Sequence, residues 1–189
     1  AVVGCGTMGS GIAVCVARSG FETLVCEAQE DLLQAGIQRV EDFFNGSIKK
    51  GKISEKQKNQ YMSQISGTTQ LKDLADCDVV IEAIVEDLAV KNTLFKELNK
   101  ICHEDTLFVS NTSTLSITAI AKDTGREDKV IGIHFCNPAP LMKLVEISRG
   151  MNTSEESYRR AVELSEKLGK IYVTTEDTPG FILNLLLVP

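Results

Sequence analysis

Residues 1–27 read AVVGCGTMGSGIAVCVARSGFETLVCE, and this stretch decides the fold. Residues 1–3 predict the end of a buried strand, and residues 4–9 match the pattern GxGxxG. Small and apolar side chains then recur at helical spacing from Thr7 to Arg18, and residues 21–26 alternate into a second strand that ends at Glu27. A strand, a glycine turn, a helix and a second strand together predict a βαβ unit.

The rest of the chain continues this alternation. Residues 30–65 predict an antiparallel helix pair broken at residues 49–52, and Ser54 with Gln57 resembles a capping box that starts its second helix. Further strands are expected over residues 78–82, 106–110, 129–135, 144–148 and 171–174, with helices over residues 87–102, 116–122 and 154–168. This order predicts an α/β fold, a Rossmann-like doubly wound and mostly parallel sheet with a helix-pair insertion after the second strand.

Composition limits the classes of protein that fit. The chain has 189 residues, 43% apolar and 24% charged, which is typical of one sizeable globular domain. A net charge of −6 gives no general attraction to nucleic acid or anionic lipid, and the last apolar run is too short for a bilayer, so no nucleic-acid and no membrane partner is expected. The six cysteines and the distant His103 and His134 lack metal-site spacing, so we expect no metal, and buried thiols in a soluble intracellular protein.

Both ends of the sequence look cut. It opens at Ala1 without Met, just before the glycine turn, and stops at Pro189 after an apolar helical run. Asp177-Thr178 before Pro179 suits a helix N-cap with proline at the first helical position, so a helix is expected from Phe181. We therefore expect part of a longer polypeptide, with one domain over residues 1–178 and the start of an interdomain helix over residues 179–189.

The glycine turn is the first candidate site. In such a turn the first glycine permits the bend, the second lets the backbone approach a pyrophosphate, and the third packs the helix against the strand. We expect the pyrophosphate of a dinucleotide on the turn formed by Gly4, Gly6, Thr7, Met8 and Gly9. Glu27 is placed to accept hydrogen bonds from an adenosine ribose, and residues 28–31 offer no Arg or Lys for a 2′-phosphate, which predicts NAD rather than NADP. A tight turn without a ligand is the alternative.

His134 is the second candidate. It lies one residue before the end of a predicted strand, and open α/β sheets bind ligands beyond the carboxyl ends of their strands. An imidazole there can take the hydroxyl proton of an alcohol while hydride leaves carbon for NAD. Glu146, in the next predicted strand, can orient the ring and stabilise its protonated form. A histidine with a purely structural role is the alternative.

Five motifs together resemble the 3-hydroxyacyl-CoA dehydrogenases, and within that family the single-function 3-hydroxybutyryl-CoA type. They are GxGxMGxGIA at residues 4–13, Ile84-Val85-Glu86 with Lys91 after it, Ser110-Asn111-Thr112-Ser113, HFxNPxPxMxLVE at residues 134–146, and Asp177-Thr178-Pro179-Gly180-Phe181-Ile182. They occur in family order over essentially the whole chain. The resemblance implies an NAD-dependent enzyme of fatty acid β-oxidation or butanoate metabolism that interconverts an (S)-3-hydroxyacyl-CoA and a 3-oxoacyl-CoA.

The resemblance also implies roles for particular residues. His134 would be the acid/base, with Glu146 as its carboxylate partner. The other implied roles are substrate contacts near the reacting oxygen for Ser113 and Asn137, an approach to the active site for Asn184, and contacts along the nicotinamide half of the cofactor for Glu86 and Lys91. The helix pair would help to hold the CoA moiety, with Lys50 and Lys52 as candidate contacts, and a solvated helix turn is the other interpretation of these lysines.

Further implications concern the rest of the protein. The family continues into a C-terminal helical domain, absent from this sequence, that supplies dimer contacts and one wall of the substrate cleft. A homodimer is thus expected for the full-length protein, in the bacterial cytoplasm or, in a eukaryote, the mitochondrial matrix. Leu185 stands where the family has Arg, which puts a closure contact of that Arg in doubt.

Several alternatives stay open at this point. Ser113 can instead cap the helix that begins near Ser116, Asn137 can support the two-proline turn, and Glu86 can be an N-terminal helix charge. At the level of function, the alternative is a catalytically silent NAD-binding module in this truncated form. A weaker one is a 3-hydroxyacid dehydrogenase that works with a lysine.

Overall fold

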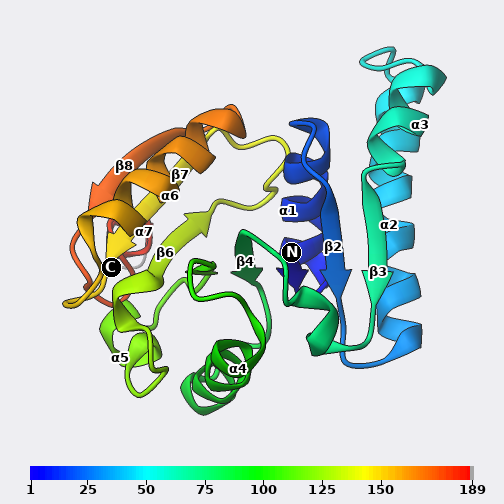
Figure 1. The fold of residues 1–189 in the computed structure, drawn as a ribbon. Helices are drawn as coiled ribbons and strands as arrows, with labels where there is room; N and C mark the ends of the chain where they lie inside the picture. Colours follow the sequence, from blue (N-terminus) through cyan, green and yellow to red (C-terminus); the bar gives the residue numbers. More distant parts are fainter. Residues whose placement is uncertain (188–189) are drawn as a thin grey trace.

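The computed structural model describes residues 1–187, and these residues form a three-layer α/β structure around one eight-stranded sheet (Figure 1). The strand order is β3-β2-β1-β4-β5-β6-β7-β8, and neighbouring strands run parallel except for the antiparallel pair β6 and β7. The strands are β1 Val2–Val3, β2 Thr23–Cys26, β3 Ile65–Thr68, β4 Val79–Glu82, β5 Leu107–Ser110, β6 Val130–Phe135, β7 Leu144–Arg149 and β8 Ile171–Thr175. The strand order reverses beside β1, which is where open α/β sheets bind ligands. The predicted fold class is confirmed.

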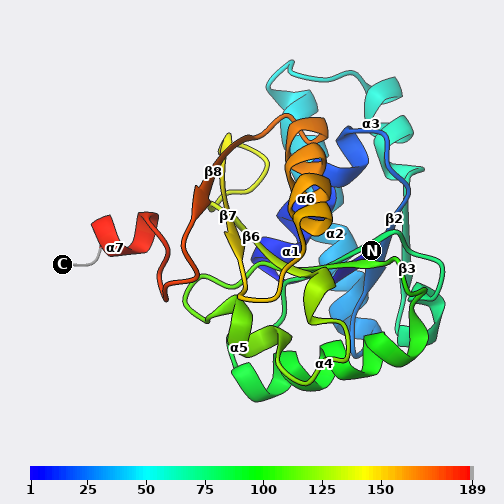
Figure 2. The same cartoon turned by 60° about the vertical axis from the view of Figure 1, so that its left-hand side comes forward.

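Helices cover both faces of this sheet (Figure 2). They are α1 Thr7–Arg18, α2 Glu30–Lys49, α3 Glu55–Met62, α4 Leu88–Ile101, α5 Ile117–Ala121, α6 Glu155–Lys167 and α7 Leu183–Leu187, with short 3₁₀ turns η1 Leu71–Leu74 and η2 Glu127–Lys129. Ile12 and Phe44 belong to the core on the α1, α2 and α6 face, and Phe95 belongs to the core on the α4 and α5 face. Val2 and Val3 point into these two cores respectively, because successive side chains of a strand alternate. None of the helices within residues 1–187 has the length and hydropathy that a bilayer crossing requires.

The helix pair after β2 differs from its prediction at one end. The capping box is confirmed, since Gln57 N donates to Ser54 Oγ (3.2 Å) and Ser54 N donates to Gln57 Oε1 (2.9 Å). The second helix ends at Met62 instead of residue 65, because residues 65–68 form β3 and pair in parallel with β2 at the sheet edge. The sequence Ile-Ser-Gly-Thr is too short and polar to indicate a strand. Its pairing with β2 is a tertiary effect.

The last helix also begins later than predicted. α7 starts at Leu183, not at Phe181, and Asp177 does not cap it. The Asp177 carboxylate instead accepts hydrogen bonds at the start of α5, from Ser116 Oγ, Ile117 N and Thr118 N. The local sequence suggested a cap for the next helix, whereas the fold brings the start of an earlier helix to the same carboxylate.

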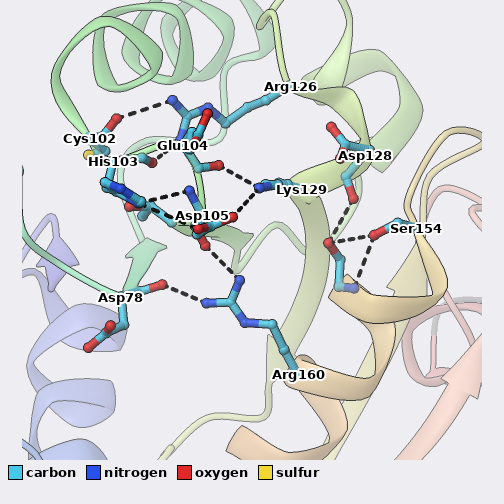
Figure 3. A network of polar contacts seen from close by, with 12 residues as sticks. Asp78, Cys102, His103, Glu104, Asp105, Arg126, Asp128, Lys129, Ser154 and Arg160 are labelled. Atoms are coloured by element: carbon cyan, nitrogen blue, oxygen red, sulfur yellow. Dashed lines mark hydrogen bonds and ion pairs between the residues drawn. The ribbon is translucent and has the colours of Figure 1, made fainter.

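The amino ends of the strands are held by side chains that bind backbone carbonyl oxygens (Figure 3). Arg126 donates to three carbonyl oxygens at the end of α4, which have no partner within the helix. From α6, Arg160 reaches the carbonyl oxygens of Asp78 (3.0 Å) and Asp105 (2.6 Å). These contacts fix the amino ends of the strands. The predicted site residues lie at the opposite, carboxyl ends.

The loop between α4 and β5 holds three side chains of metal-ligating type, His103, Glu104 and Asp105. All three are exposed, and the Lys129 ammonium lies 2.8 Å from an Asp105 oxygen (Figure 3). An ammonium at this distance already balances one of the two negative charges and would repel a cation. The cluster is best described as a solvated loop.

The cysteines are all free, and their burial departs in part from expectation. Cys5, Cys15, Cys26 and Cys102 are buried, whereas Cys77 and Cys136 are only half-buried. Burial raises the pKa of the Cys5, Cys26 and Cys102 thiols to about 11. These three therefore act as small apolar side chains at neutral pH.

Candidate functional site

The glycine turn between β1 and α1 has a separate steric reason for each glycine. Gly4 has φ +88°, and an added Cβ would lie 2.7 Å from the carbonyl oxygen of Ala83 in the chain after β4. At Gly9 a Cβ would lie 1.7 Å from the carbonyl oxygen of Gly4, so α1 can pack this closely only with glycine there. At Gly6 a Cβ would meet nothing within 4 Å, which leaves its backbone open to a ligand. This division matches the dinucleotide-binding pattern.

Glu27 stands at the end of β2 beside this turn. Its Oε1 accepts a hydrogen bond from Cys5 N (2.5 Å), and its Oε2 accepts one from Ala28 N (3.3 Å). Glu27 and the glycine turn both line a cavity of about 850 Å³. This cavity runs from the turn along the start of α4, and its walls include Gly4, Gly6, Leu32, Ile84 and Val90. A carboxylate next to an apolar slot suits the ribose and adenine of a dinucleotide.

A second carboxylate, Glu82, ends β4 and is completely buried. Its Oε1 binds the Lys91 ammonium from α4 and accepts a hydrogen bond from Ile84 N (2.8 Å), and its Oε2 accepts one from Ser110 Oγ (2.6 Å). Lys91 is 1% exposed, so this ion pair lies inside the protein. Buried charges are found paired in this way because an isolated one is costly.

Lys91 also connects to Glu86, whose Oε2 lies 3.3 Å from Nζ. The other oxygen, Oε1, accepts hydrogen bonds from the loop after β5, from Thr112 Oγ1, Ser113 N, Thr114 N and Thr114 Oγ1. Burial opposes the charge of Glu86, but these donors and Lys91 outweigh it and hold the pKa of Glu86 below its ordinary value. Glu86 therefore clamps the loop that carries Ser113, and it is not simply a helix N-terminal charge, since Asp87 caps α4.

His134 and Glu146 occupy directly paired positions on the antiparallel strands β6 and β7. His134 Nδ1 lies 2.7 Å from Glu146 Oε2. The His134 side chain is 11% exposed and the Glu146 side chain 0%, so the carboxylate is shielded from water while the imidazole remains partly accessible. The ring of Phe181 packs beside the imidazole ring, with 5.8 Å between the two ring centroids. The spacing of twelve residues brings the two groups together because the chain turns back on itself between them.

The remaining predicted residues divide into those near this pair and those apart from it. Asn184 Nδ2 donates to the carbonyl oxygen of Ser113 (3.1 Å), which joins α7 to the loop after β5. Ser113 is half-buried and does not cap α5, because Ser116 does. Asn137 is exposed just beyond β6 and precedes a cis peptide bond to Pro138.

Lys50 and Lys52 are not brought to the site by any described contact. Both are exposed in the turn between α2 and α3, which Figure 1 shows projecting at the β3 edge of the sheet. Lys58 from the same cluster is bound to Glu41 (2.7 Å) and Asn45 (2.7 Å). The lysine-rich turn thus remains a predicted site for CoA.

Sequence reasoning missed two residues that organise the site, Glu82 and Asp177. A charged residue at the end of the apolar run Val79-Val80-Ile81 was a usable signal for Glu82, because a carboxylate there must find a partner. No local signal points from Asp177 to α5, since some 60 residues separate the two in sequence. Only the folded chain reveals that contact.

The site thus combines a glycine turn with the features of a dinucleotide-binding turn and a histidine paired with a buried carboxylate, an arrangement that is chemically able to move a proton. This combination defines the domain as that of a nucleotide-dependent dehydrogenase. The chain belongs to the 3-hydroxyacyl-CoA dehydrogenase family, since the family profile described as "3-hydroxyacyl-CoA dehydrogenase, NAD binding domain" matches residues 1–178. Its cofactor is NAD, as the sequence predicted.

Similar proteins agree with this assignment. The chain is 44% identical over 188 residues to a probable 3-hydroxybutyryl-CoA dehydrogenase of Deinococcus radiodurans, covering 100% of this chain and 67% of the relative. It is 43% identical over 195 residues to the human mitochondrial hydroxyacyl-coenzyme A dehydrogenase, covering 100% and 62%. The crystal structure of M. tuberculosis FadB2 matches with a TM-score of 0.97 at 41% identity, covering 100% and 67%. The chain thus spans about two thirds of the length of the relatives it matches, and the predicted family and class of enzyme are confirmed.

Proposed function

We propose that this protein oxidises an (S)-3-hydroxyacyl-CoA to the 3-oxoacyl-CoA and catalyses the reverse reduction, with His134 as the acid/base. The family and the names of the relatives support the reaction. The proposed role of His134 is supported above all by the 2.7 Å contact between its Nδ1 and the buried Glu146 carboxylate. An acceptor at Nδ1 favours the tautomer with its proton there, which leaves the Nε2 lone pair free for the substrate.

The proton steps follow from this arrangement. His134 Nε2 accepts the proton of the 3-hydroxyl group as the hydride leaves C3, and in reverse the imidazolium protonates the forming alkoxide. NAD, when bound, accepts or supplies the hydride. Glu146 keeps the ring oriented and balances the imidazolium charge. General acid–base catalysis of this kind contributes about 10²–10⁴-fold, and the rest depends on the positioning of the reactants.

Other residues are proposed to hold the two ligands. Ser113 and Asn137 would donate to the reacting oxygen of the substrate, and Lys50 and Lys52 to phosphates of CoA. Glu27 would accept hydrogen bonds from the adenosine ribose, and the backbone at Gly6 with Thr7 and Met8 would bind the pyrophosphate. Glu86 and Lys91 would lie along the nicotinamide half, and the clamp that Glu86 makes on the Ser113 loop supports a role near the reacting end.

The test is the substitution His134→Gln in the complete protein, with acetoacetyl-CoA reduction followed by loss of NADH absorbance. We expect kcat to fall by about 10²–10⁴-fold, with the Kd for NADH unchanged. His103→Gln is the matched control, because His103 is 65% exposed on the opposite edge of the sheet and should leave kcat unchanged. Undiminished turnover in His134→Gln would refute the assignment.

The alternative is a catalytically silent NAD-binding module in this form. It is supported by the fact that the chain covers only 67% of the length of a relative, so residues needed for turnover would lie in the remaining part. A 189-residue protein that binds NADH but does not reduce acetoacetyl-CoA would establish this alternative. We further propose residues 1–178 as the NAD-binding domain and residues 179–189 as the connection toward a second, dimerising domain, in which Leu183–Leu187 are helical and residues 188–189 lie outside the described part of the chain. A bacterial cytoplasmic or mitochondrial matrix location fits the six free cysteines.

A further inference from the structure

The segment between β8 and α7 leads directly into the first residues of α7, and we call residues 177–184 the strap. It is attached to the rest of the fold at three places. Asp177 binds the start of α5, the amides of Ile182 and Leu183 bind Glu146, and the side chain of Asn184 binds Ser113. α7, which begins within the strap, extends away from the sheet layers (Figure 2). The strap is therefore fastened to both the acid/base pair and the loop that carries Ser113.

The middle attachment completes the surroundings of the acid/base pair. Glu146 Oε2 contacts His134 Nδ1, while its Oε1 accepts hydrogen bonds from Ile182 N (2.9 Å) and Leu183 N (2.9 Å). Because the Glu146 side chain is 0% exposed, water cannot easily replace these amides if they move. Phe181, 2% exposed, packs beside the imidazole ring in the same stretch. The orientation of His134 thus depends on where the strap lies.

The strap does not hold this shape through regular secondary structure. Residues 177–182 are neither helix nor strand, and Phe181 has φ +49°, a conformation that residues other than glycine adopt only when their surroundings impose it. The contact that fastens the start of the strap is made by Asp177. Its carboxylate accepts three short hydrogen bonds, from Ser116 Oγ (2.8 Å), Ile117 N (2.6 Å) and Thr118 N (2.8 Å).

Asp177 itself makes no described contact with His134, Glu146 or Ser113. Its partners belong to α5, whose Ile117 and Ile120 are buried in the core beside the sheet. Charge-assisted hydrogen bonds to a carboxylate are the stronger kind, so this contact anchors the strap to a rigid part of the fold. Glu146 lies on β7, and β7 pairs with β8, the strand that leads into the strap. Anchoring the strap therefore also fixes its distance from Glu146.

We propose that Asp177 is a positioning residue for the acid/base pair. By fastening the strap to α5, it holds the amides of residues 182 and 183 on Glu146 and the ring of Phe181 on His134. The inference rests on the proposed function for its effect on turnover. The structural part, that Asp177 keeps these amides bound, can be measured without any reaction.

The first experiment is a double-mutant cycle in the complete protein, using Asp177→Asn, Glu146→Gln and the double variant. We expect Asp177→Asn to lower kcat by about 10- to 100-fold, since a displacement of about 1 Å at a catalytic group can cost about 100-fold. The Kd for NADH should not change, because Asp177 does not line the nucleotide cavity. In the Glu146→Gln background the same substitution should change kcat by less than about 2-fold, because two residues that act through one contact are not additive. An equal loss in both backgrounds would overturn the proposal.

Glu176→Gln is the matched control. Glu176 is the neighbouring carboxylate, it is exposed, and within residues 1–187 its side chain makes no hydrogen bond or ion pair. This control should keep the wild-type kcat. A loss in Glu176→Gln equal to that in Asp177→Asn would show that any charge change here disturbs the site, and would count against a specific role for Asp177.

The second experiment measures amide hydrogen exchange of the strap and needs no substrate. We expect Asp177→Asn to increase exchange at Ile182 and Leu183 by about 10-fold or more, while amides of α1 keep their protection. Ser116→Ala removes only one of the three donors to Asp177, and it serves as the milder variant if Asp177→Asn folds poorly. Unchanged exchange in these variants would overturn the proposal. If the variants exchange faster than the wild-type protein but the wild-type protein has no dehydrogenase activity, only the proposed function is refuted.

Discussion

Replacement of Lys91 by Met tests the buried ion pair at the start of α4. The Lys91 and Glu82 side chains are 1% and 0% exposed, and they contact each other directly. Met keeps most of the length of the lysine stem but removes the ammonium. The Glu82 carboxylate then retains two donors, Ser110 Oγ (2.6 Å) and Ile84 N (2.8 Å), without a counter-charge.

The expected loss follows from the cost of a stranded charge. Removal of one partner of a buried ion pair lowers the free energy of unfolding by about 3–5 kcal/mol. The lower end, about 3 kcal/mol, applies because two donors remain on Glu82. Glu82→Gln alone should cost a similar amount, whereas Lys91→Met combined with Glu82→Gln leaves no stranded charge and should cost about 1 kcal/mol. The double variant is thus expected to be more stable than either single variant.

The assay is urea unfolding of the four proteins at neutral pH, followed by circular dichroism. Lys96→Met is the matched control, because Lys96 is exposed on the same helix and its loss should change the free energy of unfolding by less than about 0.5 kcal/mol. The reasoning fails if Lys91→Met costs less than about 1 kcal/mol, or if the double variant loses the sum of the two single losses, about 6 kcal/mol.

Two further predictions concern titratable groups. The pKa of Glu86 is lowered in the folded protein, so its stabilisation is present above the unfolded pKa of about 4.3 and is lost as the pH falls through the folded value. Because Glu86 is 38% exposed, Glu86→Gln should cost only about 1 kcal/mol at pH 7 and progressively less as the pH falls below the unfolded pKa, as measured by urea unfolding, and a cost that grows with acid would contradict this. Burial raises the pKa of the Cys5, Cys26 and Cys102 thiols from 9.0 to about 11, which reduces their thiolate roughly 100-fold relative to an unperturbed thiol. Iodoacetamide at pH 7.5 should therefore leave these three unmodified in the native protein, and mass spectrometry that finds them labelled as fast as in urea would refute the argument.

Local sequence patterns were sufficient for the parts of the site that form from neighbouring residues. The glycine turn and Glu27 belong to one βαβ unit, so the GxGxxG pattern and the strand that follows it predicted their relative positions. The His134 and Glu146 pair was also accessible, because two consecutive strands place residues on either side of one turn opposite each other. In both cases the contacts join elements that are adjacent along the chain.

Contacts between distant segments needed the folded structure. Sequence reasoning treated Asp177 as the cap of the next helix and Glu86 as a cofactor contact or a helix charge. The structure directs the first carboxylate to α5 and the second to the loop after β5. The edge strand β3 was missed for a similar reason, since Ile-Ser-Gly-Thr becomes a strand only through its hydrogen bonds to β2.

The sequence by itself determined the fold class, the nucleotide turn and the pairing of His134 with Glu146, because periodicity and glycine spacing act within a few residues and two consecutive strands bring their residues together. Only the tertiary structure decided which carboxylates hold the loops around that pair, and that one oxygen of Glu146 binds the strap. A carboxylate binds whichever donors the fold brings within about 3 Å, and that proximity is a property of the packed sheet and helices, not of the local sequence.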